Sequence, residues 1–430
     1  MRIKKISTGI IISILMVLLV CNVVLAQGVL NLWCQDRNLD RSQHRGFNWV
    51  YREFEKATGI KIKVAHAPIE DLLKKTLAAF AAGTGPDIMD IDRAWLGAYL
   101  KNDLLAPFPP DLQEKWESMA VPAFKKFEVK GKVYELPIWV DVYALNWNKD
   151  MFKEAGLDPN SPPQTWEEFR AYAKKLTKYD ENGKIVRVGY AIRYMGNPTG
   201  VVQKHLWALW SAKASIITPY DTLTGGRTNF NNKGGYAAID LIKKMLYEDK
   251  STAFGFGDPR DAFVEKKAAM QISECAAIPS RAFKEAPDLN YGMALPPHPK
   301  WGIRVTNING CPSIVVVDGP KKDIAFKFIR YLMRPEIQMF IPLTWDVDQL
   351  GFGIVPFARF LYKHPWFQNM YYDAVLKMAE YGRPQPVEIN YTEASDIFGK
   401  YMVQAWFNKI SVKEALAKAE KEINALLAEE

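Results

Sequence analysis

Residues 152–169 read FKEAGLDPNSPPQTWEEF. Near the end of this stretch, Thr165 is followed three residues later by Glu168. A threonine and a glutamate at this spacing form a capping box, in which each side chain accepts a hydrogen bond from the backbone N–H of the other residue. The pattern predicts a helix that begins after Thr165 and turns one apolar face to a core, formed by Phe169, Tyr172, Ala173 and Leu176.

Before this stretch, strand-like and helix-like segments alternate. Gly59 and Gly83 follow the two helical segments and are expected to end them, because glycine readily adopts the backbone angles of a helix end. The β-α-β-α-β order is typical of a sheet covered by helices. The expected elements, in chain order, are strand 29–33, helix 46–57, strand 60–64, helix 69–82 and strand 87–91.

After this stretch the alternation continues to the C-terminus. Ser411 and Glu414 form a second capping box, which predicts a last helix with Leu416, Ala419, Ile423 and Leu427 facing inward. Neither a repeat nor a low-complexity linker interrupts the chain, so compact lobes are expected. The other expected elements are strands 188–192 and 314–317 and helices 236–247, 263–270 and 322–333.

Length and composition favour a folded protein of two domains. The 430 residues are 48% hydrophobic, which is enough for two cores and excludes a disordered chain. The formal net charge is +8, but no tract of five consecutive lysines or arginines occurs. Nucleic acid is therefore not an expected partner, because its recognition needs a concentrated basic surface.

Residues 1–26 have the pattern of a signal peptide. Three basic residues open the chain, an apolar run follows, and residues 24–26 suit a signal peptidase. Their removal would lower the net charge from +8 to +5. We expect an exported protein in the periplasm or on the outer face of the cytoplasmic membrane. A lipid anchor at Cys21 is an alternative, although Val20 before it is larger than such sites prefer; a retained apolar anchor is another.

Catalytic and metal-binding signatures are absent from the sequence. It contains no GxSxG, HExxH or GxxxxGK[ST] motif and no CxxC pair, and its five histidines are scattered singly. We therefore expect no enzyme activity, no cofactor and no metal. Cys34, Cys275 and Cys311 remain after export, and the sequence leaves open whether two of them form a disulfide.

Several segments together resemble the family 1 extracellular solute-binding proteins of bacterial ABC importers, of the carbohydrate-binding type. Two departures occur: Trp147 stands where tyrosine is commoner, and a charged residue replaces the usual glycine of the segment at 263–270. These motifs are features of the scaffold and identify the ligand poorly. The matching segments are AAGTGPD at 81–87, GKVYELP at 131–137, LNWNKD at 145–150, FKEAGLDP at 152–159 with TWEEF at 165–169, FVEKKAAM at 263–270 and KDIAFKFIRYL at 322–332.

The resemblance implies an α/β fold of the type II periplasmic-binding-protein class, with two lobes joined by crossing strands and a ligand held between them. It also implies a monomer that captures a sugar or oligosaccharide by hinge closure and delivers it to the membrane permease. Lobe 1 is expected at 27–140 plus 300–345 and lobe 2 at 141–299 plus 346–430. The expected crossings lie near 139–143, 300–305 and 344–355.

Ligand contacts are expected where strands end, because open α/β sheets bind ligands there, and at the first crossing and the other segment ends where the resemblance implies the cleft. A sugar offers hydroxyl groups and an apolar ring face, so polar side chains beside aromatic rings are the candidates. For Trp207 and Trp210, which lie three residues apart in an expected helix, packing in the core remains an equal alternative. The candidates are Trp33, Gln35, Asp36, Asp92, Trp95, Asp141, Tyr143, Trp207, Trp210, Glu274, Asn309, Gly310, Trp345 and Arg383.

Three other interpretations stay open. The ligand could be a polyol or phosphorylated polyol, bound by arginines such as Arg193, Arg304 or Arg383, or by Arg37. The protein could be an exported glycoside hydrolase, with its two carboxyl groups among Asp36, Asp92, Asp141 and Glu274. It could also present its ligand to a membrane receptor as a sensor adaptor.

Overall fold

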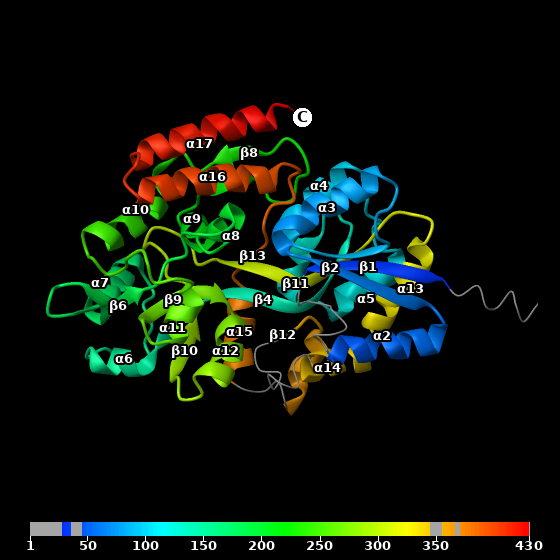
Figure 1. The fold of residues 1–430 in the computed structure, drawn as a ribbon, viewed down its shortest axis with the longest axis horizontal. Coiled ribbons are helices and arrows are strands. Elements are labelled where there is room, and N and C mark those ends of the chain that lie inside the picture. Colours follow the sequence, from blue (N-terminus) through cyan, green and yellow to red (C-terminus); the bar gives the residue numbers. More distant parts are fainter. Residues whose placement is uncertain (1–27, 36–44, 345–354, 366–369, 430) are drawn as a thin grey trace, which may run out of the picture.

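The computed structural model describes residues 28–35, 45–344, 355–365 and 370–429. The expected signal peptide, Cys21, Asp36 and Trp345 lie outside these ranges. The fold is two-lobed and α/β, as expected, with helices packed around a sheet that runs from one lobe to the other (Figure 1). In the described residues, no helix is both long and apolar enough to cross a membrane.

The first lobe begins with the predicted β-α-β-α-β order. Strand β1 (Val29–Gln35) pairs in parallel with β2 (Lys61–Ala67) and β3 (Ile88–Ile91). Helices α2 (Arg45–Thr58) and α3 (Ile69–Ala81) connect them, followed by η1 (Arg93–Trp95), α4 (Leu96–Lys101), α5 (Pro110–Met119) and η2 (Pro122–Phe127). Gly83 has a φ of +68°, the left-handed angle expected of a glycine that ends a helix.

Two long antiparallel strands join the lobes. Strand β4 (Glu135–Asn148) pairs with β11 (Thr306–Val316) from Glu135 to Val142. From Tyr143 to Trp147, β4 pairs instead with β9 (Ala268–Glu274). The main path through the sheet is β2-β1-β3-β11-β4-β9-β6-β5. The change of partner between positions 142 and 143 therefore marks the point at which β4 passes from one lobe to the other.

The second lobe contains the middle of the chain and its C-terminal helices. Residues 166–176 form a helix opened by a complete capping box, as predicted. The elements are α6 (Lys149–Glu154), α7 (Trp166–Leu176), β5 (Lys178–Tyr179), β6 (Ile185–Tyr190), α8 (Pro198–Gln203), α9 (Leu206–Ser211), β7 (Ser215–Thr218), β8 (Arg227–Asn229), α10 (Lys233–Tyr247), α11 (Pro259–Val264), β9, α12 (Ala277–Glu285), β10 (Tyr291–Ala294), α16 (Tyr391–Trp406) and α17 (Val412–Leu427).

The chain returns to the first lobe before its last helices. Strand β12 (Val355–Pro356) pairs with β4 at Val140 and Trp139, and Phe357 packs against the first-lobe side chains Trp116 and Phe124. The elements of this return are α13 (Lys322–Leu332), α14 (Pro335–Thr344), β12 and η3 (Arg359–Lys363). Helix α15 (Met370–Ala379) then lies beside β10 of the second lobe, and β13 (Gly382–Arg383) follows it (Figure 1).

The prediction of one helix over residues 263–270 is wrong. Helix α11 ends at Val264, and β9 begins at Ala268. Between them Lys266 has a φ of +60°, which breaks the helix. Strand β9 is buried at every position from Ala268 to Ser273, with Gln271 and Ser273 included, so its burial lacks the period of two of a half-exposed strand.

Strand β11 and the C-terminal helix differ from their predictions, the first in extent and the second in burial. Strand β11 begins at Thr306, eight residues before the predicted strand at 314. At the C-terminus, Leu416, Ala419 and Ile423 are buried as predicted, whereas Leu427 is only partly buried. Ser411 accepts a hydrogen bond from the backbone N–H of Glu414, as its capping position requires.

The two lobes also touch away from the crossing strands. An apolar cluster of the second lobe includes Phe398 and Trp406 of α16 and continues into Trp95 and Tyr99 of the first lobe. At this contact the backbone oxygens of Val387 and Glu388 lie against Gly97. A side chain on Gly97 would place its Cβ 2.3 Å from the Val387 oxygen, so only glycine allows this approach.

Candidate functional site

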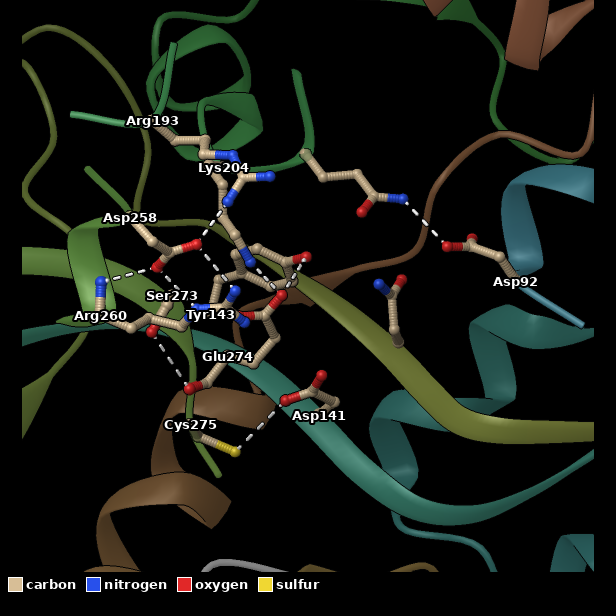
Figure 2. Close-up of polar contacts among 12 residues, drawn as sticks. Asp92, Asp141, Tyr143, Arg193, Lys204, Asp258, Arg260, Ser273, Glu274 and Cys275 are labelled. Carbon is tan, nitrogen blue, oxygen red and sulfur yellow. Dashed lines mark hydrogen bonds and ion pairs between the residues drawn. The ribbon is translucent and has the colours of Figure 1, made fainter. Parts of the chain in front are cut away.

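A group of charged side chains gathers where β4 passes between the lobes (Figure 2). Two members come from β4 itself, one from the end of β9, one from the turn after α8 and two from the start of α11. Residues from four separate parts of the chain thus meet at one place. We call this group the junction cluster: Asp141, Tyr143, Lys204, Asp258, Arg260 and Glu274.

Glu274 is the centre of the junction cluster. Its carboxylate forms an ion pair with Lys204, accepts a hydrogen bond from the Tyr143 hydroxyl at 3.3 Å and lies 3.9 Å from Nη1 of Arg260. Burial acts to raise the pKa of Glu274, but the charges of Lys204 and Arg260 outweigh it and lower the pKa to about 2. The carboxylate is therefore ionised at neutral pH.

Asp258 orients Arg260 through a two-pronged ion pair. Both Asp258 oxygens accept from the guanidinium, one from Nε and one from Nη2, each at 2.9 Å. Asp258 also caps α11 by accepting from the backbone N–H of Arg260 at 2.9 Å, and Arg193 donates to it from a second side. Burial opposes ionisation, yet the bonds from Arg260 hold the pKa of Asp258 well below its ordinary value.

Asp141 differs from Glu274 because no cation binds it directly in the described structure. It is buried, and the Cys275 thiol donates to its Oδ1 at 3.8 Å. Burial and then the negative charge of Glu274 raise its pKa well above the ordinary value. Asp141 also lies opposite Asn309 in the β4–β11 register, so a carboxyl and an amide stand side by side.

Asp92 connects the lobes by a polar chain. It follows β3 and caps η1, accepting from the backbone N–H of Ala94 at 2.9 Å. Its other oxygen accepts from Nε2 of Gln203, on α8 of the second lobe, at 3.2 Å. The chain continues through Gln385 to Asn309, with distances of 3.4 and 3.3 Å. Burial raises the pKa of Asp92.

Arg383 is largely buried and makes no ion pair with any described residue. Its guanidinium carbon lies 4.8 Å from the ring centre of Trp210 and 5.7 Å from that of Tyr220, and Nη2 donates to Ser215 at 3.2 Å. Burial lowers its pKa, and its Nε makes no hydrogen bond within the described residues. Nε of Arg383 is therefore a buried donor that lacks a hydrogen-bond acceptor among the described residues.

The structure brings several predicted contact residues together and separates others. Asp141, Tyr143 and Glu274 belong to the junction cluster, and Asp92 and Asn309 belong to the polar chain beside it. Gly310 follows Asn309 on β11, and Arg383 pairs with Asn307 of the same strand. Asp36 and Trp345 fall on residues that the structure does not describe.

The predicted tryptophans mostly pack in the interior. Trp207 is completely buried, with its ring 6.0 Å from that of Phe169, and Trp95 is also buried. Trp210 is buried beneath Arg383. In this structure Trp207 and Trp210 therefore pack in the core, which was the alternative to a ligand contact. Trp33 and Gln35, on β1, are only partly buried.

Lys204, Asp258, Arg260, Gln203 and Gln385 were not among the predicted contacts. Asp258 followed by Pro259 is an N-cap signal that could have marked the start of α11. Lys204 carries no such signal, because it stands between Gln203 and His205 and meets Glu274 only in the fold. From the sequence, Arg193 is a candidate only for a phosphorylated ligand.

The arrangement suits recognition through hydrogen bonds. Lysine and arginine donate, ionised carboxylates accept, and an aspartate with a raised pKa can do either. Among the described residues, no group of three histidine, cysteine, aspartate or glutamate side chains is placed to hold a metal ion. The junction cluster therefore offers fixed donors and acceptors on both sides of the lobe crossing.

Sequence comparisons identify relatives over most of the chain. A Brucella abortus protein whose name assigns it to the binding proteins is 24% identical over 389 residues, which cover 87% of this chain and 89% of that protein. The sn-glycerol-3-phosphate-binding periplasmic protein UgpB of Pectobacterium atrosepticum is 26% identical, and the match covers 65% of this chain and 64% of UgpB.

Solved structures show the same fold. A cyclic α-maltosyl-1,6-maltose-binding protein from Arthrobacter globiformis matches with a TM-score of 0.75 and 20% identity, over 94% of this chain and all of that chain (100%). A Thermotoga lettingae ABC transporter solute-binding protein, bound with α-D-tagatose, matches with a TM-score of 0.77 and 21% identity, over 93% and 100%. These matches confirm the two-lobed architecture.

A family model covers a region that contains both crossing strands, β4 and β11. It matches residues 49–342 and describes bacterial extracellular solute-binding proteins. The match extends over more than half of the sequence and agrees with the fold. The chain therefore belongs to the bacterial extracellular solute-binding proteins.

Proposed function

We propose that this protein captures a carbohydrate outside the cytoplasmic membrane and delivers it to the permease of an ABC importer. The observation that carries the proposal is the polar array that reaches across both lobes, from Asp92 and Asn309 on one side to Lys204 and Glu274 on the other. A ligand that touches both sides favours the state in which they are close.

The chemistry of the array supports a sugar as the ligand. A sugar hydroxyl both donates and accepts, so it needs donors and acceptors placed together. Lys204 and Arg260 supply donors, Glu274 and Asp92 supply acceptors, and the Tyr143 ring adds an aromatic surface over which Lys204 lies at 4.7 Å. Solved relatives of this fold bind a cyclic maltosyl-maltose and tagatose.

In the capture step, side chains of the site exchange hydrogen-bond partners, and no covalent bond is made or broken. In the present structure, Gln203 and Asp92 join the lobes directly, and Lys204 neutralises Glu274. Sugar hydroxyls can replace such contacts at little net loss, since each broken hydrogen bond is exchanged for another. The ligand then adds its own differential affinity to lobe closure, and the permease recognises the closed form.

The lobe boundaries follow from strand pairing in this proposal. The expected first boundary at 140/141 lies close to the change of partner on β4 at 142/143. The expected second segment of lobe 1 begins at 300, whereas Ile303 still bonds to Ser211 of the second lobe and β11 begins at 306. Because residues 355–361 pack with the first lobe and α15 packs against β10, we place the start of the last second-lobe segment near 370.

The contacts that we assign to the sugar include residues predicted from the sequence, together with Lys204 and Arg260, which only the structure places in the junction cluster. Trp33, Gln35 and Gly310 remain candidates on the two strands that lead to the site. Asp36 and Trp345 remain sequence predictions. The principal assigned contacts are Asp92, Asp141, Tyr143, Lys204, Arg260, Glu274, Asn309 and Arg383.

The proposed function also implies where the protein acts and which membrane partner it meets. The family is extracellular, which supports export and removal of residues 1–26, with delivery to the membrane permease as a monomer. Lipid attachment at Cys21 would keep the protein at the membrane surface without changing the capture step. No nucleic acid and no cofactor enter this function.

A phosphorylated polyol is the second candidate ligand, and one observation favours it. Arg383 is a partly buried guanidinium without an acidic partner among the described residues, and such a group suits a phosphate or carboxylate. A glycerol-3-phosphate-binding relative shares 26% identity with this chain. The junction cluster already pairs its cations with carboxylates, which favours the neutral sugar.

Thermal unfolding of residues 27–430 against a ligand panel tests the proposal. The panel contains mono-, di- and oligosaccharides, polyols and glycerol 3-phosphate. A ligand at 100 times its dissociation constant adds about 2.7 kcal/mol, which raises Tm by a few degrees in a chain of this size. Recovery of the sugar intact separates binding from hydrolysis.

The outcomes of the panel are distinct. A shift with one class of sugar, recovered unchanged, supports the proposal. A shift with glycerol 3-phosphate alone would favour the phosphorylated polyol as the ligand. Release of new reducing ends from a saccharide would establish a hydrolase. No shift with any member would contradict the carbohydrate assignment.

A further inference from the structure

A groove of about 550 Å³ lies on the second lobe between α7, α10 and the turn at residues 299–301. None of the residues that line it belongs to the junction cluster or to the polar chain of Asp92. We propose that this groove is a second saccharide-binding site, open to solvent and independent of lobe closure. Its volume falls in the range of small-ligand sites, about 300–1,000 Å³.

Two tryptophans form one wall of the groove. Trp166 is buried and fixed in place, because its Nε1 donates to the Pro297 oxygen at 3.1 Å. Trp301 stands nearly perpendicular to it, with ring centres 6.4 Å apart and an angle of 78°. Trp301 nevertheless remains 43% exposed. An exposed indole supported by a rigid neighbour offers an apolar face on which a sugar ring can stack.

A third aromatic residue and a cation complete this surface. Tyr236, on α10, lines the groove and is 47% exposed. The Lys233 ammonium lies 5.5 Å from the ring centre of Trp301 and forms no ion pair with a described residue. Exposed apolar side chains that are scattered singly are common, but two exposed aromatic rings gathered in one concave site indicate a ligand.

Arg170 supplies an oriented donor in the same groove. Its Nε and Nη2 donate to the two oxygens of Asp249 at 2.6 and 2.9 Å, and Nη2 also donates to Glu248 at 3.0 Å. These bonds fix the plane of the guanidinium. Within the described residues Nη1 makes no hydrogen bond, so a ligand hydroxyl can bond to a group that is already in position.

The charges of the groove favour a neutral ligand. Four lining residues are basic and three are acidic, so the net charge is only +1. An anionic phosphate, nucleic acid or membrane surface would require a clear excess of positive charge. Mixed charges around aromatic faces suit the hydroxyls and apolar ring of a saccharide. The charged lining residues are Glu167, Arg170, Lys174, Lys233, Asp240, Lys244 and Asp249.

An open groove on one lobe would act differently from the junction cluster. Both of its main walls, α7 and α10, belong to the second lobe, so binding there does not require the lobes to approach (Figure 1). We expect weak affinity, because one face of the sugar stays in water. The site would retain a longer saccharide at the protein surface.

The test follows the indole N–H signals of the ¹⁵N-labelled protein, residues 27–430, during titration with maltohexaose, cellohexaose or mannohexaose. The Trp301 signal is identified by its loss in Trp301→Phe. At least one of the three sugars is expected to move this signal with a dissociation constant of about 1–20 mM. The Trp207 signal, from a fully buried ring, serves as the internal reference.

Two tyrosine variants with matched exposure separate a local site from an indirect effect. Tyr236→Ala removes a groove residue, whereas Tyr179→Ala removes a tyrosine that is also 47% exposed but lies on β5 outside the groove. Tyr236→Ala is expected to weaken the Trp301 response about fivefold, and Tyr179→Ala to leave it unchanged.

A Trp301 signal that none of the three sugars moves would overturn the proposal, as would a response that Tyr236→Ala leaves intact. The proposed function fails separately. If the thermal panel finds no sugar while Trp301 responds as described, the groove stands and the capture of sugar by the junction cluster does not.

Discussion

At the residue scale, the pairing of Lys204 with Glu274 determines the charge state of the junction cluster. Both side chains are mostly buried, at 11% and 24% exposed. Removing one partner of such a pair leaves the other charged and poorly solvated, which destabilises a protein more than the pair itself stabilises it. The same pair also determines how the protein responds to acid.

Lys204→Met is expected to destabilise the fold by about 2–3 kcal/mol at pH 7, less than for a fully buried pair. The pKa of Glu274 is lowered in the folded protein, so its contribution is present above the ordinary value of 4.5 and is lost as pH falls toward 2. The variant should therefore lose less stability between pH 5 and pH 3 than the wild type. Urea unfolding at several pH values measures both effects.

The control for this prediction is Lys418→Met, which breaks an ion pair with Glu414 that is 50% and 45% exposed. Its expected effect is below about 0.5 kcal/mol. Equal destabilisation by the two variants would contradict the importance of the buried pair.

Asp141 is predicted to have the opposite pH dependence. Its pKa is raised in the folded protein by burial and by Glu274, so the unfolded chain releases its proton first and stability falls as pH rises through the folded pKa. Asp141→Asn keeps the shape and removes the charge. We expect the variant to be more stable than wild type by about 1 kcal/mol near pH 8, with a smaller difference near pH 4.

Asp221→Asn, at an exposed position, is the matched control for Asp141→Asn and should show no such trend. The readout is the free energy of unfolding across pH 4–8. A stability difference that does not change with pH would show that Asp141 is not the titrating group. Sugar affinity, measured in parallel, reports whether its carboxyl contacts the ligand.

At the element scale, the capping box of α7 links a local pattern to a surface site. The Glu168 N–H donates to Thr165 Oγ1 at 3.2 Å, and the Thr165 N–H donates to Glu168 at 3.1 Å. Helix α7 also supplies Trp166 and Arg170 to the groove. The stability of its first turn therefore supports both the lobe and the proposed second site.

Thr165→Ala is expected to destabilise the protein by about 1 kcal/mol, because it leaves backbone N–H groups of the first turn without their partner. Thr165→Ser retains the hydroxyl and should restore most of the loss. The urea midpoint measures the change at constant m-value. A Ser variant as unstable as the Ala variant would assign the effect to the lost methyl group.

Some elements could be predicted from the sequence because their signals are local. The spacing of Phe169, Ala173 and Leu176 needs only one buried face to become a helix, and that face is buried. Residues 263–270 could not be read in this way, because Phe263, Val264 and Ala268–Met270 are all buried, and short buried apolar runs fit a helix as well as a strand. The turn at Lys266 has a left-handed backbone angle, which a lysine in the sequence does not predict.

At the scale of the whole molecule, the contact between Gly97 and residues 387–388 holds the lobes together beside the crossing strands. The backbone oxygens of Val387 and Glu388 would lie 2.3 and 2.7 Å from a Cβ at position 97. On the other side of this contact, the Thr392 hydroxyl donates to the Ala94 oxygen at 2.9 Å. Close approach of the lobes therefore depends on a missing side chain.

Gly97→Ala is expected to favour separated lobes by about 1–3 kcal/mol, the usual effect of overpacking. Affinity for the sugar that gives the largest thermal shift should fall about 5–100-fold, because the binding-competent state becomes rarer. Small-angle X-ray scattering should show a larger radius of gyration in the unliganded variant.

Gly200→Ala is the matched control, since nothing lies within 4 Å of a Cβ added at that position of α8. We expect its affinity and radius to equal those of the wild type. A Gly97→Ala protein with unchanged affinity and radius would mean that this contact does not separate during ligand exchange.

The sequence by itself determined the order of most elements, because capping boxes, glycine turns and apolar periodicity act over a few residues. It also indicated the family, and with it the two lobes, through the resemblance of several segments. Only the tertiary structure brought the residues of the junction cluster together. Lys204 and Glu274 are 70 positions apart, and Asp92 and Gln203 are 111 apart. Charged side chains pair according to their positions in space, and no local pattern along the chain encodes which lysine will meet which carboxylate.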